Sequence, residues 1–518
     1  MVLRLGIDVG GTNTDAVILD GRKVLAGVKR TTTEDVMSGI AAALEAVIEA
    51  AGIARDAIDV AMIGTTHFTN AVIERRALDQ VAAIRLGLPA TACLPPMVDW
   101  PADLVEEVGG HRYLLHGGYE FDGREIAPLD TDGLRRIADE IVAKGIRAAA
   151  VSSVFSPINR DMEEEARKIL TEAVPGLSVV LSSEIGRIGL LERESAAIMN
   201  ASLLSLADKT VTAFGDALKG AGLHCPFFVT QNDGTLMAAD TVRRFPVLTF
   251  ASGPTNSMRG AAFLTGVKDA IVIDIGGTTT DVGALQKGFP RQASTVVDVG
   301  GVRTNFRMPD VFSIGLGGGT IVSGEGESLK VGPQSVGYRL TSEARVFGGE
   351  VLTCTDIAVA SGAADIGDKS AVADLDPDYI AAVRARIAEM LETAVERSRI
   401  SPEPLPVIAV GGGSILAPDQ IGGLEVLRPE NFAVANAVGA AIAQISGEVD
   451  RIFALDKRTR EECLGDADEE AREIAIRAGA VAETLEVIER EDVPLAYLPG
   501  NATRIHVKVV GDMGGLDA

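Results

Sequence analysis

The chain has 518 residues, which corresponds to two to four domains of ordinary size. Hydrophobic residues make up 47% of it and charged residues 23%, which is typical of a soluble globular protein with a large core. The formal net charge of −25 argues against a nucleic acid or an anionic membrane as the main partner. For the same reason, an anionic ligand needs donors that are placed locally around it.

The four cysteines lie far apart and form no C-x-x-C pair, so neither a zinc site nor a disulfide framework is indicated. This usage of cysteine fits a reducing cytoplasm. The N-terminus shows no cationic segment followed by an apolar one, and no apolar run approaches the roughly 18 residues of a membrane-spanning helix. We therefore expect a cytoplasmic protein without a membrane partner.

The first elements of the chain are three predicted strands in residues 2–32, followed by an amphipathic helix with Thr33 as its cap and Gly52 at its end. The octapeptide Asp8-Val-Gly-Gly-Thr-Asn-Thr-Asp15 joins the first two strands, and apolar runs flank it on both sides. This pattern predicts a strand, a tight turn and a strand, that is, a β-hairpin. It matches neither the Rossmann nor the Walker pattern of phosphate loops.

The segment "VAMIGTTHFTNAVIERR" predicts a strand, a turn and a helix, with Thr65, Thr66, His67 and Asn70 at the turn. A helix N-terminus presents free N–H groups to an anion or a carbonyl oxygen, which makes Thr65 and Thr66 candidate catalytic residues. Capping of the helix by threonine is the alternative interpretation.

Residues 192–219 predict one long helix that crosses from one half of the chain to the other. Arg193 and Glu194 lie at its start. They are either active-site residues or charges that cap the helix.

The octapeptide recurs as Asp274-Ile-Gly-Gly-Thr-Thr-Thr-Asp281, and six of its eight positions are identical to the first copy. The two copies lie too far apart for a solenoid repeat, so they indicate two homologous halves that each open with the same hairpin. Two such hairpins predict a two-sided phosphate clamp, because glycines let backbone N–H groups approach phosphate oxygens closely.

Each residue type in this clamp has an expected role. Asp8 and Asp274, at the strand ends, are expected to hold a hydrated Mg²⁺ between the halves. Asp15 and Asp281 either orient a nucleophile or brace their hairpins by accepting backbone N–H bonds. The expected phosphate-binding residues are Gly10, Gly11, Thr12, Asn13, Gly276, Gly277, Thr278 and Thr279.

A further Gly-rich turn follows an apolar strand at Gly411, Gly412, Gly413 and Ser414, where backbone is able to pack against a flat base and ribose. A similar stretch, "SIGLGGGTIVSG", spans residues 313–324. The spacing alone leaves open which of the two turns contacts adenosine.

The last part of the chain is rich in charged residues between 448 and 492. A helix is predicted over 466–488 and a strand over 502–513, which indicates a small appended α/β piece. The charged face is either solvated or a docking surface for a partner subunit.

The two hairpins and the late strand–GGG turn resemble the actin, sugar kinase and heat-shock chaperone ATPase superfamily, and within it the hydantoinase A/5-oxoprolinase family. The segments that carry the closer resemblance are "GIDVGGTNTDAVIL" (6–19), "GTTHFTNAVIER" (64–75), "GGYEFDGREIAPLD" (117–130), "FSPINRDMEEEA" (155–166), "LLERESAAIMNASL" (190–203), "ASGPTNSMRGA" (251–261), "VIDIGGTTTDVG" (272–283), "SIGLGGGTI" (313–321) and "VGGGS" (410–414). The Pro-rich, Cys-containing stretch usual in the family is not recognisable after residues 331–340.

The resemblance implies an α/β protein with two related halves of the actin-like ATPase (ribonuclease H-like) type, a nucleotide cleft between them, and a small C-terminal α/β extension. The expected domains are residues 1–192, 193–445 and 446–518. ATP and Mg²⁺ are the expected cofactors. The expected partners are a small cyclic amide and a companion subunit, either hydantoinase B-like or of another kind, in an oligomer.

Three functions fit these observations. The first is ATP-dependent hydrolysis of a cyclic amide, such as a hydantoin, oxoproline or a related lactam, after phosphoryl activation of the ring carbonyl. The second is a subunit of a biotin-free, ATP-dependent ketone carboxylase. The third is an ATP-switched activator or binding protein. The sequence does not single out a substrate.

Overall fold

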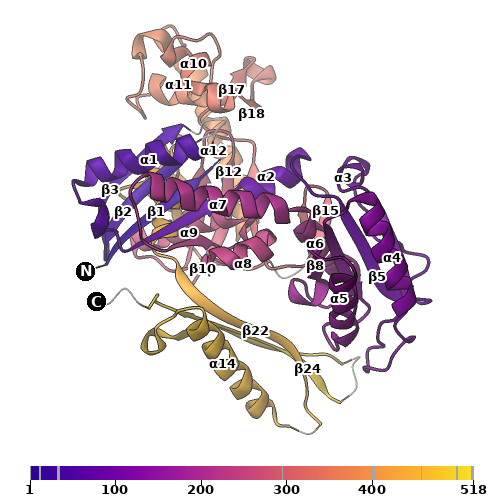
Figure 1. Ribbon diagram of the computed structural model, residues 1–518. Coiled ribbons are helices and arrows are strands. Elements are labelled where there is room, and N and C mark those ends of the chain that lie inside the picture. Colours follow the sequence, from indigo (N-terminus) through magenta and orange to yellow (C-terminus); the bar gives the residue numbers. More distant parts are fainter. Residues whose placement is uncertain are drawn as a thin grey trace.

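The computed structural model describes residues 2–10, 13–31, 36–293, 296–399, 403–456, 458–496 and 500–514 of the chain. Gly11 and Thr12, two expected phosphate-binding residues, and the expected cap Thr33 lie outside the described residues. Three sheets of four or more strands form the framework, and helices cover their faces (Figure 1). No helix in the described ranges is long and apolar enough to cross a membrane.

The largest sheet has nine strands in the order β23-β24-β22-β10-β9-β4-β1-β2-β3. They are β1 (Leu3–Val9), β2 (Asn13–Asp20), β3 (Lys23–Thr31), β4 (Val60–Thr65), β9 (Phe227–Thr230), β10 (Thr235–Ala238), β22 (Gln444–Ala454), β23 (Glu486–Pro494) and β24 (Ala502–Gly511). The three predicted N-terminal strands are confirmed, and β1, β4 and β9 run parallel. The carboxyl ends of these three parallel strands therefore lie at one edge of the sheet.

A seven-stranded sheet repeats this plan in the second half. Its hairpin β11–β12 is antiparallel, and β19 lies parallel beside β11 as β4 does beside β1. The expected class of two related α/β halves is thus confirmed. The strands are β11 (Ala270–Ile275), β12 (Thr280–Gln286), β13 (Phe289–Pro290), β16 (Val311–Ile314), β19 (Val407–Val410), β20 (Gln420–Ile421) and β21 (Leu424–Leu427).

The third sheet has four parallel strands in the order β6-β5-β7-β8. Its strands are β5 (Val81–Leu88), β6 (His111–His116), β7 (Ala148–Ser153) and β8 (Ser178–Leu181). Ala82 and Ile84 pack in one core with α4 (Thr131–Lys144) and α5 (Asp161–Ala173), whereas Val81 and Ala83 pack in another with α6 (Leu190–Ser202). Successive side chains point to opposite faces of a strand, so continuous apolar strands are buried on both sides.

The predicted helix over 192–219 is two helices, α6 and α7 (Leu204–Gly220), which are separated at Leu203. Asp79 explains the break. Its backbone N–H donates to the Ser202 carbonyl at 2.7 Å, and its carboxylate accepts the Ser205 N–H at 2.9 Å. The backbone of one residue distant in the sequence thus binds the end of α6, and its side chain caps the start of α7.

The expected C-terminal α/β piece is present, and its strands continue the nine-stranded sheet beyond β10 (Figure 1). The helix α14 (Arg460–Arg477) packs its alanine-rich face on β22 and β24. The helix predicted over 466–488 is wrong beyond Arg477, because Glu486–Pro494 forms β23 and pairs with β24. Domain boundaries at 192 and 445 stay predictions.

The remaining helices follow the usual spacing of buried apolar residues. In α1 (Val36–Ala51), Ile40, Leu44 and Val47 face the first sheet, because residues three and four apart share a helix face. The other elements are α2 (His67–Glu74), α3 (Ala102–Glu107), α8 (Ala239–Arg244), α10 (Leu340–Glu343), α11 (Cys354–Ala360), α12 (Pro377–Ser398), β14 (Val297–Val299), β15 (Val302–Thr304), β17 (Thr320–Ser323) and β18 (Lys330–Ser335).

The two halves meet where α9 (Ser252–Thr265) crosses α13 (Ala435–Ala441). Glycines permit the close approach. A Cβ added to Gly439 would lie 1.8 Å from the carbonyl oxygen of Asn256, and one added to Gly260 would lie 1.8 Å from the carbonyl oxygen of Ala435. Both obstructing atoms belong to backbone, which cannot move aside as a flexible side chain does.

We expect Gly439→Ala to lower the free energy of unfolding by about 1–3 kcal/mol, because overpacking forces the two helices apart. Thermal unfolding followed by circular dichroism measures this loss. The control is Gly465→Ala in α14, where an added Cβ meets no atom within 4 Å. That variant should melt at or slightly above the wild-type temperature, since alanine is the better helix former. Equal melting temperatures for Gly439→Ala and wild type would contradict the close crossing.

Candidate functional site

The two predicted hairpins have the same geometry. Asp8 pairs with Asp15 across β1–β2, and Asp274 pairs with Asp281 across β11–β12. Each turn is closed by the same bond, from Gly10 N–H to the Asn13 carbonyl at 3.0 Å and from Gly276 N–H to the Thr279 carbonyl at 2.9 Å. The repeated octapeptide therefore builds a repeated structure.

A glycine lies beside the first carboxylate of each hairpin. Gly64 on β4 pairs with Asp8, and a Cβ added there would lie 2.3 Å from Asp8 Oδ1. Gly411, directly after β19, plays the same part, because its Cβ would lie 2.2 Å from Asp274 Oδ1. Any side chain at either position would displace the carboxylate, so these glycines keep room for it.

Asp8 is buried and held by two amide side chains. Asn256 Nδ2 of α9 donates to its Oδ1 at 3.2 Å, and Asn436 Nδ2 of α13 donates to its Oδ2 at 3.0 Å. Burial raises the pKa of Asp8 to about 6, the negative charges of Asp15 and Asp274 add to this, and the two amides oppose it.

Asp274 lies in the same electrostatic environment. The Ser257 hydroxyl donates to its Oδ2. Burial is the main cause that raises the pKa of Asp274, the charge of Asp15 raises it further, and Lys29 and Ser257 oppose the shift. The first carboxylates of both hairpins therefore interact, and the structure brings the two predicted metal-binding residues into one cluster.

Asp15 and Asp281 interact with side chains. Asp15 is buried and forms an ion pair with Lys29 Nζ at 2.5 Å, and the Ser313 hydroxyl donates to Asp281. Burial raises the pKa of both, to about 6 for Asp281, where the charge of Asp274 contributes as well. In Asp15 the charge of Lys29 opposes the shift.

Both Gly-rich turns lie against the second hairpin. Gly413 N–H donates to the Ile275 carbonyl at 2.7 Å, Gly318 N–H to Gly276 at 3.0 Å, and Gly319 N–H to Gly277 at 2.7 Å. These bonds surround a turn whose Thr278 and Thr279 are exposed. The geometry thus unites residues 411–414 and 317–319 in one glycine-rich surface, and the assignment of adenosine to one of them stays a prediction.

Thr65 and Thr66 lie at the carboxyl end of β4, next to the first hairpin. The Thr65 hydroxyl lies 2.6 Å from His67 Nδ1, and the hydroxyl of Ser252 donates to the Thr65 carbonyl at 2.9 Å. Thr66 N–H donates to the Val9 carbonyl at 3.4 Å. The pair is therefore placed beside the carboxylate cluster, and its catalytic role stays a prediction.

Arg193 and Glu194 are buried inside the protein. Arg193 Nη1 donates to the carbonyls of Arg187 and Ile188 at 3.0 and 2.8 Å. Glu194 accepts from Arg85 Nε at 2.7 Å and from the Ser152 hydroxyl at 2.6 Å. The sequence left two interpretations open for this pair, an active-site role and capping of the helix. Neither describes these contacts, because both side chains hold segments that lie beside them in space.

Several polar residues of the cluster were missed by the sequence analysis. Asn256 and Ser257 lie in a segment that carries the family resemblance without an assigned role, and Asn436 lies in the alanine-rich segment "AVANAVGAA". A lone amide or hydroxyl side chain among small residues of a buried helix indicates a specific hydrogen-bond partner, because buried polar groups need partners. This was the signal in the sequence that could have identified these residues.

Comparison with known proteins is consistent with this geometry. The family model of the hydantoinase/oxoprolinase N-terminal region matches residues 4–174, and the hydantoinase/oxoprolinase model matches residues 193–371. Acetophenone carboxylase gamma subunit of Aromatoleum aromaticum is 28% identical over 400 residues, which cover 69% of this chain and 53% of that protein. Caprolactamase subunit alpha of Pseudomonas jessenii is 27% identical over 472 residues, which cover 85% and 65%.

The chain spans between about half and two thirds of the length of these two curated relatives. The crystal structure of the ATP-dependent caprolactamase from Pseudomonas jessenii has the same fold, with a TM-score of 0.77, 20% identity, and coverage of 98% of this chain and 87% of that one. The two family models together extend over both hairpins of the duplicated site. The chain therefore belongs to the hydantoinase/oxoprolinase family.

Proposed function

We propose that the protein uses ATP to activate the carbonyl group of a cyclic amide for hydrolysis, either as an enzyme or as the ATP-handling subunit of one. One observation carries this proposal: equivalent hairpins bring the buried Asp8 and the half-buried Asp274 into one carboxylate cluster beside glycine-rich turns. Backbone N–H groups at such turns bind phosphate oxygens, and paired carboxylates bind the accompanying cation.

The donor set fits Mg²⁺. Mg²⁺ is usually bound through one or two carboxylates and keeps several of its waters. Within the described residues, no group of three or more His, Cys, Asp or Glu side chains is arranged to hold a metal by itself. Asp8 and Asp274 would instead supply one carboxylate each. Burial is the main cause that raises the pKa of both, and the charge of neighbouring carboxylates adds to it. A bound Mg²⁺ would neutralise this charge and that of the phosphates.

The chemistry requires positioning and charge neutralisation. Amide resonance makes the ring carbonyl a poor electrophile. Transfer of the γ-phosphoryl group to the carbonyl oxygen would release ADP and leave an activated imidate, and water would then add to its carbon. The ring C–N bond of this adduct would break as the nitrogen takes up a proton, and hydrolysis of the resulting acyl phosphate would leave a carboxylate and inorganic phosphate. The turns at Gly10 and at Gly276–Gly277 would leave room for the phosphates to approach the backbone, and closure of the two halves would exclude water from the transfer step.

The relatives support the reaction class and suggest a companion subunit. One is named a caprolactamase subunit, and a lactam is a cyclic amide. Because the two curated relatives are themselves named as subunits, we propose that this chain acts together with a second subunit in an oligomer.

The second candidate is carboxylation of a ketone. It is favoured by the similarity to a subunit of acetophenone carboxylase. Both reactions begin with a phosphoryl group on a carbonyl or enolate oxygen, so the same clamp would serve either. Their difference lies in the acceptor and in a requirement for bicarbonate.

We expect Asp8→Ala and Asp274→Ala each to lower the rate of ADP release by at least about 100-fold while the far-ultraviolet circular dichroism stays unchanged, since each removes one carboxylate from the proposed Mg²⁺ site. Asp20→Asn serves as the control, because Asp20 lies at the opposite end of the same hairpin from Asp8. Normal ADP release by both alanine variants, with substrate present, would contradict the assignment.

The raised pKa of Asp8 predicts a pH-dependent stability in Mg²⁺-free, nucleotide-free buffer. The folded protein holds the Asp8 proton more tightly than the unfolded chain. The contribution of Asp8 to stability is therefore complete below pH 3.8 and is lost as the pH rises through about 6. Relative to wild type, Asp8→Asn should gain up to about 3 kcal/mol in the free energy of unfolding between pH 4 and 8.

Urea unfolding at pH 4, 6 and 8 measures this difference, and the lost hydrogen bonds of the variant shift all three values alike. Asp20→Asn, at the opposite end of the same hairpin, is measured alongside as the matched control substitution. A constant difference between Asp8→Asn and wild type at all three pH values would show that Asp8 titrates as it does in the unfolded chain.

A screen of acceptors tests the function itself. The protein is assayed for ADP release with hydantoins and lactams of different ring sizes, with and without a co-purified companion subunit. We expect one ring class to stimulate ADP release in the absence of bicarbonate. Stimulation only by a ketone together with bicarbonate would establish the carboxylase instead, and slow turnover unaffected by every acceptor would indicate an activator.

A further inference from the structure

A second site lies outside the carboxylate cluster, in a cavity of about 800 Å³. Its walls come from the segments after β7, β8 and β9 (156–161, 183–188 and 231–233) and from β22, α14 and β24. In Figure 1 this is the region where the C-terminal strands face α5 and β8. Ligands of open α/β sheets bind outside the carboxyl ends of parallel strands, and three such ends meet here. The volume is that of an ordinary small-molecule site.

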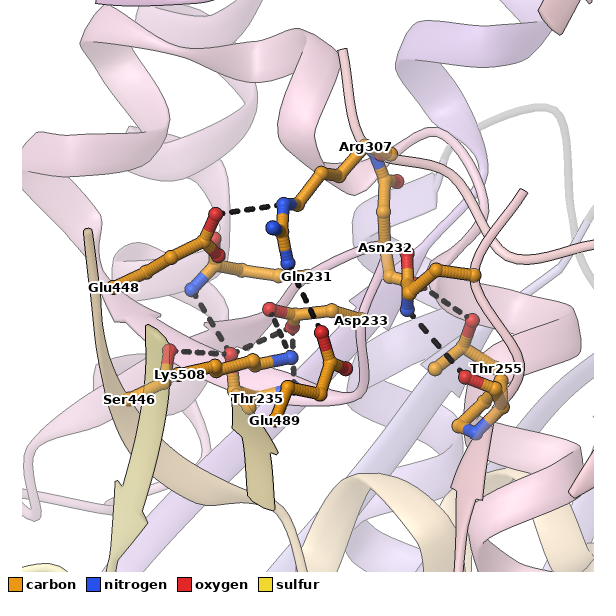
Figure 2. A network of polar contacts seen from close by, with 12 residues as sticks. Gln231, Asn232, Asp233, Thr235, Thr255, Arg307, Ser446, Glu448, Glu489 and Lys508 are labelled. Atoms are coloured by element: carbon orange, nitrogen blue, oxygen red, sulfur yellow. Dashed lines mark hydrogen bonds and ion pairs between the residues drawn. The ribbon is translucent and has the colours of Figure 1, made fainter. Parts of the chain in front are cut away.

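Most cations near this cavity are already neutralised (Figure 2). Arg307 Nε lies 2.6 Å from Glu448 Oε1, and its Nη1 lies 3.4 Å from Glu489. Lys508 Nζ lies 2.7 Å from Asp233 Oδ2. In each of these pairs, a buried positive charge faces a carboxylate.

Arg187 differs from these cations. Its nearest carboxylate is Asp450, at 3.6 Å from Nε, and Asp450 is already engaged by a two-pronged ion pair with Arg504. Only 25% of the Arg187 side chain is exposed. Its Nε is buried and has no hydrogen-bond partner in the described part of the chain. Burial, followed by the charges of Arg307 and Arg504, lowers the pKa of Arg187. Its positive charge is thus only partly compensated.

The backbone that carries Arg187 is firmly positioned. Arg193 Nη1 binds the carbonyls of Arg187 and Ile188, as described above. The side chain of Asn305 accepts the Arg187 N–H at 3.2 Å and donates to the Gly189 carbonyl at 3.2 Å. A guanidinium on a fixed segment pays little conformational entropy when it binds a ligand.

The cavity and the carboxylate cluster share one turn of α9. Thr255 Oγ1 donates to the carbonyl of Asn232 on the cavity wall at 2.8 Å (Figure 2), and the next residue, Asn256, donates to Asp8 and to Thr230. A molecule in the cavity therefore lies beside elements that also build the proposed phosphate site.

We propose that this cavity binds a small molecule through its carboxylate group, and that Arg187 is the side chain that pairs with it. Guanidinium is suited to this role, because its planar fork donates two parallel hydrogen bonds to a carboxylate. A protein with a net charge of −25 repels anions at long range, so an anion site needs such a local cation. Resting on the proposed function, the ligand is a cyclic amide that bears a carboxylate.

The test compares two pairs of rings that differ only in a carboxylate-bearing group: 5-oxoproline with 2-pyrrolidinone, and hydantoin-5-acetate with hydantoin. Binding to the full chain is measured by calorimetry in the absence of ATP. Wild type should bind at least one charged ring at least about tenfold more tightly than its uncharged counterpart, and Arg187→Gln should abolish the difference. Arg187→Lys should keep part of it, because the charge remains but the fork is lost.

The matched control is Arg451→Gln. Arg451 lines the same cavity but is half-exposed and already paired with Glu470. It should keep the wild-type preference, and an unchanged melting temperature shows that each variant is folded. The proposal is overturned if wild type binds neither charged ring or shows no preference for it, or if Arg187→Gln retains that preference.

The outcome is separable from that of the proposed function. If carboxylate binding depends on Arg187 but no ring stimulates ADP release, the proposed site is supported and the proposed amide hydrolysis is contradicted. ADP release stimulated by a ring, with no role for Arg187, would do the reverse.

Discussion

The structure depends on the placement of two carboxylates beside each other, one buried and one half-buried. Asp8 and Asp274 come from different halves of the chain, and the charge of Asp274 adds to the burial that raises the pKa of Asp8. Such an arrangement is unfavourable unless donors or a cation compensate it. The amides of Asn256 and Asn436, the hydroxyl of Ser257 and the ammonium group of Lys29 supply part of this compensation. The glycines at 64 and 411 supply the room.

The duplicated hairpins were predictable because the information is local. A β-branched run, two glycines and a second apolar run specify a hairpin by themselves, and the near-identity of two copies indicates a shared role. The aspartates could be found for the same reason. The C-terminal strand β23 was not predictable, since "ETLEVIE" contains good helix formers and is a strand only because β24 offers its edge.

The residues that the sequence did not reveal act through tertiary contacts. Asp79 divides α6 from α7 from a distance in the chain, and Asn436 reaches Asp8 from α13, 428 positions further along the chain. Arg187 belongs to the same class, because its partly compensated charge is visible only when Asp450, Arg307 and Arg504 are seen around it. Residue types and spacing carry no record of such contacts, so the sequence pattern locates the two hairpins but not the side chains that surround them.

Three consecutive residues of α9 donate hydrogen bonds to three different parts of the molecule. Thr255 is bonded to the wall of the cavity, Asn256 to the carboxylate of the first half, and Ser257 to the carboxylate of the second. Successive residues of a helix rise by only about 1.5 Å and turn by about 100°. One turn of this helix therefore connects three parts of the molecule. Any movement that separates Asp8 from Asp274 must therefore break or rearrange at least one of these bonds. Opening of the two halves is thus coupled to the hydrogen bonds of α9.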